Sequence, residues 1–130
     1  MNVLLSIKPK YVDKIVQSIK KYEFRKIIFK NKSPWRVYIY CSSPVKKIVG
    51  YFTIETIIED HPYNLWETCK DHSGISKEDF FTYFEDREKG YAIKIDKIDI
   101  FKNPVEPNEY FDNFIPPQSY KYLEVDLLSS

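Results

Sequence analysis

Stretches in which apolar and polar side chains alternate predict most of the strands, because successive residues of a β-strand point to opposite faces. The predicted strands cover residues 3–7, 22–29, 35–41, 45–59 and 90–101. Gly50 lies inside one of the two long strands, where a glycine indicates a bulge or a close approach of backbones. We expect the long strands 45–59 and 90–101 to be neighbours in one curved sheet.

Apolar residues at helical spacing predict the first helix, since positions three or four apart share one helix face. These positions are Tyr11, Val12, Ile15, Val16 and Ile19. Pro9 suits the first turn, where its missing N–H is not needed, so the helix should cover residues 9–18. Two shorter helices are predicted at residues 63–71 and 76–84, the second with Ser76 as its N-cap.

The order of these elements predicts an α+β fold, with helices closing the ends of a small, mixed, curved sheet. At 130 residues the chain is long enough to bury a core, and we interpret residues 1–130 as a single domain. The tail from Asn103 contains four prolines and five aromatic residues. We expect it to be an ordered loop packed over the sheet, because so many aromatic rings favour burial.

Positive and negative charges are unevenly distributed, although the net charge is only +1. Residues 1–50 contain 12 Lys and Arg against 2 Asp and Glu, whereas residues 51–130 contain 8 against 17. A basic half can bind polyanions; alternatively, the two halves face each other and partly cancel. Two cysteines without a CxxC motif, and no visible targeting or membrane-spanning segment, predict a reduced, cytoplasmic protein that does not enter a membrane.

The densest group of charges lies at residues 18–25, where the first predicted helix leads into a strand. Lys20, Glu23 and Arg25 are costly to hold together unless they pair with one another or meet a ligand. Arg25 can fork onto a carboxylate or phosphate, and Glu23 with Lys20 can carry acid–base chemistry. We predict that the three side chains face one solvent-accessible cleft. The alternative is a surface salt bridge worth less than about 1 kcal/mol.

Two other polar segments are candidates for the same cleft. Ser42 and Ser43 follow a predicted strand, and their hydroxyl and N–H groups could hold a phosphate or a base edge. Gln118 and Ser119 offer an amide and a hydroxyl on a loop stiffened by prolines. The alternatives are a plain turn for the first segment and a packed terminal segment for the second.

Neither a metal nor a cofactor is expected. His61, Cys69 and His72 could suggest zinc, but no fourth ligand or supporting partner is evident. With only three glycines, the chain also lacks a glycine-rich phosphate-binding loop.

The segment from Ser18 to Arg25 resembles the G-x-K-x-x-E-x-R signature of ASCH domains, a PUA-like superfamily. Similarity extends over most of the chain, at residues 5–9, 40–45, 49–52, 90–93 and 117–120. Ser18 stands where the family has glycine, so a turn with positive φ there would be strained by about 1 kcal/mol.

The resemblance implies a PUA-type β-barrel of five or six strands with a ligand-binding cleft. It implies that the partner is RNA, another single-stranded nucleic acid or a modified nucleoside, and that the protein regulates transcription or translation. The residues expected to bind the ligand are Lys8, Lys20, Glu23, Arg25, Ser42, Ser43, Gln118 and Ser119. Arg25 should contact a phosphate or base edge, whereas Lys32, in a surface loop, should act only as a distant charge.

Some ASCH domains are small enzymes, so a hydrolase is the first alternative to a binding module. One group hydrolyses N4-acetylcytidine and another is described as a ribonuclease; in an enzyme, Lys20 and Glu23 would be catalytic. The amidohydrolase group has threonine at the position of Glu23, and its further catalytic glutamate would correspond to Glu67. The second alternative is a protein-binding module that uses its tyrosines as anchors.

Overall fold

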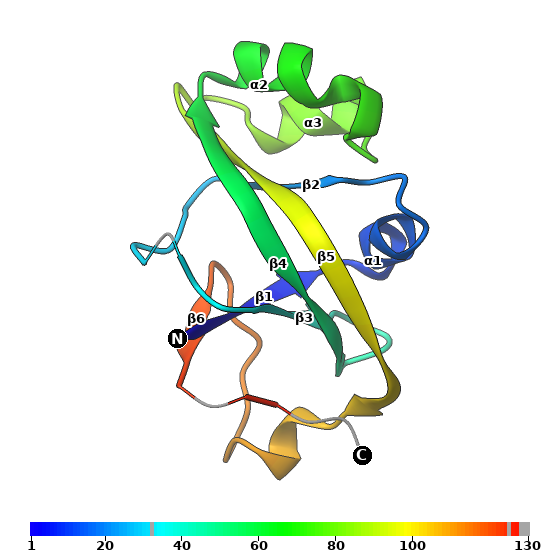
Figure 1. The fold of residues 1–130 in the computed structure, drawn as a ribbon. Coiled ribbons are helices and arrows are strands. Elements are labelled where there is room, and N and C mark those ends of the chain that lie inside the picture. Colours follow the sequence, from blue (N-terminus) through cyan, green and yellow to red (C-terminus); the bar gives the residue numbers. More distant parts are fainter. Residues whose placement is uncertain (32, 125, 128–130) are drawn as a thin grey trace.

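The computed structural model describes residues 1–31, 33–124 and 126–127, which form a curled six-stranded sheet with helices packed against it (Figure 1). The strands are β1 (Asn2–Ile7), β2 (Tyr22–Arg25), β3 (Val37–Cys41), β4 (Lys47–Asp60), β5 (Gly90–Val105) and β6 (Lys121–Leu123). The helices are α1 (Pro9–Val16), α2 (Pro62–Cys69) and α3 (Lys77–Tyr83), and the short 3-10 turns are η1 (Lys70–His72) and η2 (Pro107–Glu109). In this part of the chain, no helix has the length and apolar character needed to cross a membrane.

The strand order β2-β5-β4-β3-β1-β6 makes the sheet mixed, because β1 and β3 run parallel while the other neighbours run antiparallel. The long strands β4 and β5 are neighbours, as predicted. The strand register shifts next to Gly50, where a Cβ atom would collide with the carbonyl oxygen of Asp99 and the Cα of Ile100. The glycine therefore permits a close backbone approach. The predicted α+β fold with a mixed, curved sheet is confirmed, and the sheet curls into a half-barrel.

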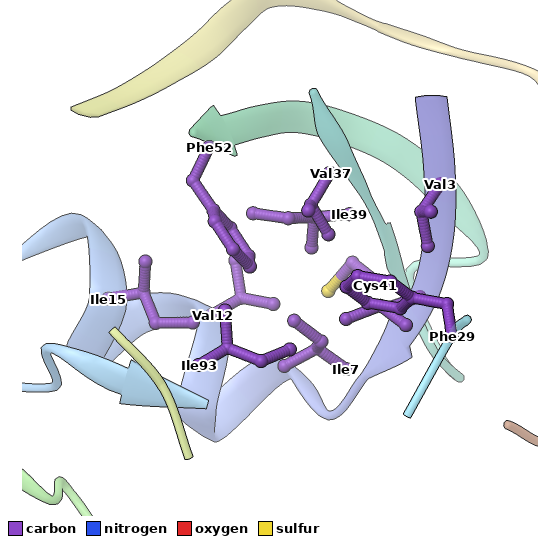
Figure 2. Packing of buried hydrophobic residues seen from close by; sticks show 11 residues of the cluster. Val3, Ile7, Val12, Ile15, Phe29, Val37, Ile39, Cys41, Phe52 and Ile93 are labelled. Atoms are coloured by element: carbon purple, nitrogen blue, oxygen red, sulfur yellow. The ribbon is translucent and has the colours of Figure 1, made fainter. Parts of the chain in front are cut away.

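The main core lies between α1 and one face of the sheet (Figure 2). Val12 and Ile15 of α1 belong to the same buried cluster as Ile39 and Phe52 of the sheet, and each of the four is at most 7% exposed. The predicted apolar stripe therefore faces the core. The helix ends at Val16, two residues earlier than predicted, because the chain turns sharply at Ser18.

A separate core joins α2 and α3 to one end of the β4–β5 pair (Figure 1). Phe80 of α3 is fully buried and packs edge-to-face on Phe24 of β2, with ring centroids 5.0 Å apart. The Ser76 hydroxyl accepts a hydrogen bond from the Asp79 N–H at 3.1 Å, which confirms the predicted N-cap. This packing fixes α3 beside β2.

Strand β2 is shorter than predicted, because the strand it pairs with, β5, begins at Gly90. Arg25 pairs with Tyr91, and β5 begins at Gly90, so residues 26–29 have no strand to pair with at that end. The chain leaves the sheet there, and Phe29 turns into the main core with 1% exposure.

The C-terminal tail is packed as predicted, but it is not only a loop. Residues 121–123 form β6, which pairs antiparallel with β1. Three residues are too few to show a period of two, and only the free edge of β1 makes them a strand. Phe111 and Phe114 of the tail pack in a cluster with Tyr38 and Tyr40.

Ser18 adopts φ of 61°, so the chain keeps the left-handed turn of the glycine-containing signature while carrying a side chain there. Replacing Ser18 with glycine is expected to raise the free energy of unfolding by about 1 kcal/mol, because the strain on Cβ is removed. Urea denaturation measures the change. Ser76→Gly is the contrasting control, since Ser76 has φ of −67° and caps α3, and it should not stabilise the protein. A Ser18→Gly variant no more stable than the parent would contradict a strained turn.

Candidate functional site

A cavity of about 460 Å³ opens between the α1 N-terminus, β2, α3 and the loop that carries Gln118. The motif residues Lys20, Glu23 and Arg25 all line it, so the prediction that they share one cleft is confirmed. Lys8 and Gln118 line the same cavity. Five of the eight residues expected to bind a ligand are thus brought together, from segments that are far apart in sequence.

Lys20 forms part of the cavity floor and is only 2% exposed. Its Nζ donates a hydrogen bond to the Ser73 carbonyl at 2.7 Å and lies 5.1 Å from the Tyr11 ring centroid and 4.7 Å from that of Phe24. Burial lowers the pKa of the Lys20 ammonium, and the nearby charge of Glu23 partly opposes that shift. The Lys20 ammonium is therefore a buried cation, stabilised by the Ser73 carbonyl and by the rings of Tyr11 and Phe24.

The close approach between Lys20 and the loop before α3 depends on Gly74. This residue has φ of 64°, and a Cβ added there would collide with the Lys20 side chain. The neighbouring Ser73 hydroxyl donates to the carbonyls of Lys70 and Ile75, so the carbonyl that accepts from Lys20 is itself held in a bonded turn. In the loop after η1, Gly74 leaves space for the Lys20 side chain and the Ser73 carbonyl accepts its hydrogen bond.

Glu23 and Arg25 form an ion pair, with Nη1 and Oε2 3.1 Å apart. Their side chains are only 8% and 11% exposed, so the alternative of a surface salt bridge is wrong. Arg25 also donates from Nη1 to the Ser6 carbonyl at 3.3 Å and from Nη2 to the Ser119 carbonyl at 2.8 Å. The guanidinium therefore ties β1, β2 and the C-terminal loop together and orients the Glu23 carboxylate.

The Ser42-Ser43 turn does not line this cavity, contrary to the prediction that it shares the cleft. The Ser42 N–H donates to the Ile7 carbonyl at 3.0 Å, so the turn starts beside the end of β1. From there, however, the chain leads into β4, whereas the chain after β1 leads into α1, and the two loops diverge.

The remaining predicted residues have other placements. Ser119 lines a second cavity, which adjoins the first, and Lys32 lies outside the described residues. Glu67 is on α2, where it forms an exposed ion pair with Lys70 at 2.9 Å, and it does not line the main cavity.

Across the described part of the chain, no three His, Cys, Asp or Glu side chains gather as metal ligands would.

Several residues of the cavity were not singled out as site residues by the sequence. Tyr11 has the helical spacing of a core residue, yet it lines the cavity, and the ammonium groups of Lys10 and Lys20 lie 5.0 and 5.1 Å from its ring centroid. Tyr83 and Asp79 come from α3, and only the packing of α3 on β2 brings them here. Burial raises the pKa of the Tyr83 hydroxyl. In the sequence, the only indication of these residues was Tyr11 directly after Lys10 near the start of α1, an aromatic ring beside a positive charge.

Comparisons with known proteins place the chain in a family and agree with its fold. The model of a family described as a domain of unknown function, DUF365, matches residues 1–118. The ASCH domain-containing ribonuclease of Zymomonas mobilis is 29% identical over 126 residues, which cover 92% of this chain and 82% of that protein. The crystal structure of ASCH from Zymomonas mobilis superposes with a TM-score of 0.88 at 28% identity, covering 95% of this chain and 87% of that one.

A longer protein also matches. The large ribosomal subunit protein uL22 of Ureaplasma parvum is 28% identical over 126 residues, which are 94% of this chain. The chain spans 39% of the length of that relative.

Proposed function

The chain belongs to the DUF365 family and has the PUA-like fold of ASCH domains, and from this premise we propose that its cavity binds one nucleotide of a single-stranded RNA. The observation that carries the proposal is the cavity itself, which combines aromatic side chains, the buried charges of Lys20 and Glu23, and basic residues. RNA is read mostly in single-stranded regions, where a base can leave the stack and enter a protein pocket.

The cavity offers the groups that a nucleobase requires. Its volume of about 460 Å³ lies in the range of small-molecule sites, roughly 300–1,000 Å³. Tyr11 and Tyr83 provide rings for stacking or edge contact, while Glu23 can accept from a base amino group and Lys20 can donate to a base carbonyl. A base bound there would replace solvent around two charges that the fold already holds in place.

Charges near the cavity suit the phosphate backbone. Lys8 and Lys10 line the cavity and are exposed, so their ammonium groups are accessible to a strand that enters it. Most of the other positive charges also belong to residues 1–50. Lysine acts on phosphates as a mobile point charge, so these contacts would add affinity without sequence preference.

Replacing Lys8 and Lys10 together with alanine is expected to weaken binding of a short single-stranded RNA by about tenfold at 0.1 M salt. The loss of two phosphate contacts should also reduce the slope of log K against log salt by about 1.4, at about 0.7 per contact. Fluorescence anisotropy across a salt series measures both quantities.

The matched control replaces Lys97 and Lys102, two exposed lysines of β5 that line neither cavity, and it removes the same charge. Equal weakening in the two double variants would mean that the RNA responds to total charge and not to this site.

A second candidate, RNA cleavage at the same site, is favoured by the relative named as a ribonuclease and by the nearness of the Glu23 charge to Lys20. The 2′-oxygen would attack the adjacent phosphorus while its proton passes to the Glu23 carboxylate. The P–O5′ bond would break, and the leaving oxygen would take a proton from Lys20, whose lowered pKa makes it a better donor than an exposed lysine. Cleavage of an RNA oligomer, but not of its 2′-deoxy counterpart, would support this candidate.

Ribosome profiles and transcript levels from cells with and without the protein would separate a role in translation from one in transcription. The amidohydrolase alternative gains no support, because Glu67 lies away from the cavity.

A further inference from the structure

We propose that the second cavity, beside the first, is a subsite for the phosphate next to the bound nucleotide. It has a volume of about 180 Å³ and shares Arg25, Tyr83 and Gln118 with the main cavity. The two spaces therefore lie on either side of one common wall. This inference rests on the proposed binding of RNA and adds the position at which the strand leaves the main cavity.

The second cavity suits an anion better than the first does. Its lining includes three cationic side chains, Arg25, Lys26 and Arg87, and no carboxylate among the described residues that form it. The main cavity, by contrast, includes both Glu23 and Asp79. Arg25 is paired with Glu23, so Lys26 and Arg87 are the cations that a phosphate would meet in the smaller space, whereas a base with polar edges finds both signs in the larger one.

The side chains of this subsite are partly held in place. The Lys26 ammonium lies over the Tyr83 ring, 4.7 Å from its centroid. Arg25 is fixed by its three hydrogen bonds, and Arg87 is at the end of the turn that follows α3, where its N–H donates to the Phe84 carbonyl at 3.0 Å. The exposed Arg87 side chain remains the most adjustable cation, and it is the one we assign to the phosphate.

The volume of the second cavity also suits a phosphate better than a whole nucleotide. A space of about 180 Å³ falls below the roughly 300 Å³ from which small-molecule sites usually begin, so it is too small for a complete nucleotide. A phosphodiester group with part of its ribose is a smaller ligand. The common wall of Tyr83 and Gln118 would then lie under the sugar that joins the two positions.

The test compares ligands with and without the neighbouring phosphate. Calorimetry measures wild-type and Arg87→Ala protein with the four ribonucleosides and with the corresponding dinucleotides, such as adenylyl-adenosine. Arg87→Ala should weaken the preferred dinucleotide about tenfold and leave its nucleoside unchanged. Lys77→Ala, an exposed lysine on α3 that lines neither cavity, should leave both unchanged. Thermal unfolding of each variant controls for folding.

Three results would overturn the inference. If Arg87→Ala leaves dinucleotide affinity intact while the Lys8→Ala, Lys10→Ala double variant weakens RNA binding, only the subsite is overturned. If the wild-type protein binds neither nucleosides nor RNA, the proposed function fails together with the subsite. If Arg87→Ala weakens inorganic phosphate but not the dinucleotide, the cavity holds a free anion and not the strand.

Discussion

Replacing Arg25 with methionine is expected to lower the free energy of unfolding by about 3–5 kcal/mol, the usual loss when one partner of a buried ion pair is removed. The substitution leaves the Glu23 carboxylate buried without its cation and removes donors from the carbonyls of Ser6 and Ser119. Methionine keeps most of the length and packing of the side chain, so the loss reports on charge and hydrogen bonds. Urea unfolding followed by far-UV circular dichroism measures it.

A double-mutant cycle separates the ion pair from the other bonds of Arg25. Adding Glu23→Gln to Arg25→Met should recover part of the lost stability, because a neutral amide is cheaper to bury than an unpaired carboxylate. Losses that simply add, or a loss below about 1 kcal/mol for Arg25→Met, would indicate a pair that behaves as if exposed. Since its donors already meet three protein oxygens, Arg25 should affect RNA binding mainly by placing Glu23 and the C-terminal loop.

Replacing Lys20 with methionine is expected to weaken binding of single-stranded RNA by about 10- to 100-fold. A charge-assisted hydrogen bond to a ligand is worth roughly 1.5–3 kcal/mol, and each 1.4 kcal/mol is a factor of ten. Anisotropy at matched salt measures the loss. Lys21→Met, which removes an adjacent exposed lysine outside both cavities, is the control and should cost far less.

The pH dependence of the wild-type protein provides an independent test of Lys20. Its pKa is lower in the folded protein than the ordinary 10.5, so binding that needs the ammonium should fall as pH rises through that folded value. Between the folded pKa and 10.5, the unfolded chain binds more protons than the folded one, and the contribution of Lys20 to stability therefore rises with pH. Binding and stability should move in opposite directions in this window.

Lys20→Met should remove both pH trends, because no titratable group remains at that position. Binding and urea unfolding measured in steps from pH 7 to pH 10.5 compare the two proteins. If wild type and Lys20→Met show the same pH dependence, other lysines or tyrosines account for it and Lys20 is not the titrating group.

The sequence alone determined the features that depend on neighbours along the chain. Alternation gave β4 and β5 as paired strands, the apolar stripe gave the buried face of α1, and Ser76 marked the start of α3. The charges at residues 18–25 predicted Lys20, Glu23 and Arg25 in one cleft, and the resemblance to a signature with glycine at position 18 indicated positive φ there. In each case a local rule, the period of a strand or helix or the chirality of the backbone, limits the conformation.

Only the tertiary structure decided which groups surround those three residues. Tyr83 and Gln118 reach the cavity because α3 packs on β2 and the C-terminal loop accepts hydrogen bonds from Ser6 and Arg25. The same contacts give the Arg25 guanidinium three protein oxygens as partners, which no local pattern indicated. Because the loops that follow β1 and β3 diverge, the Ser42-Ser43 turn does not line the cavity. These outcomes depend on contacts between segments up to about a hundred residues apart, and the free energy of such contacts is not encoded in any local pattern of side chains.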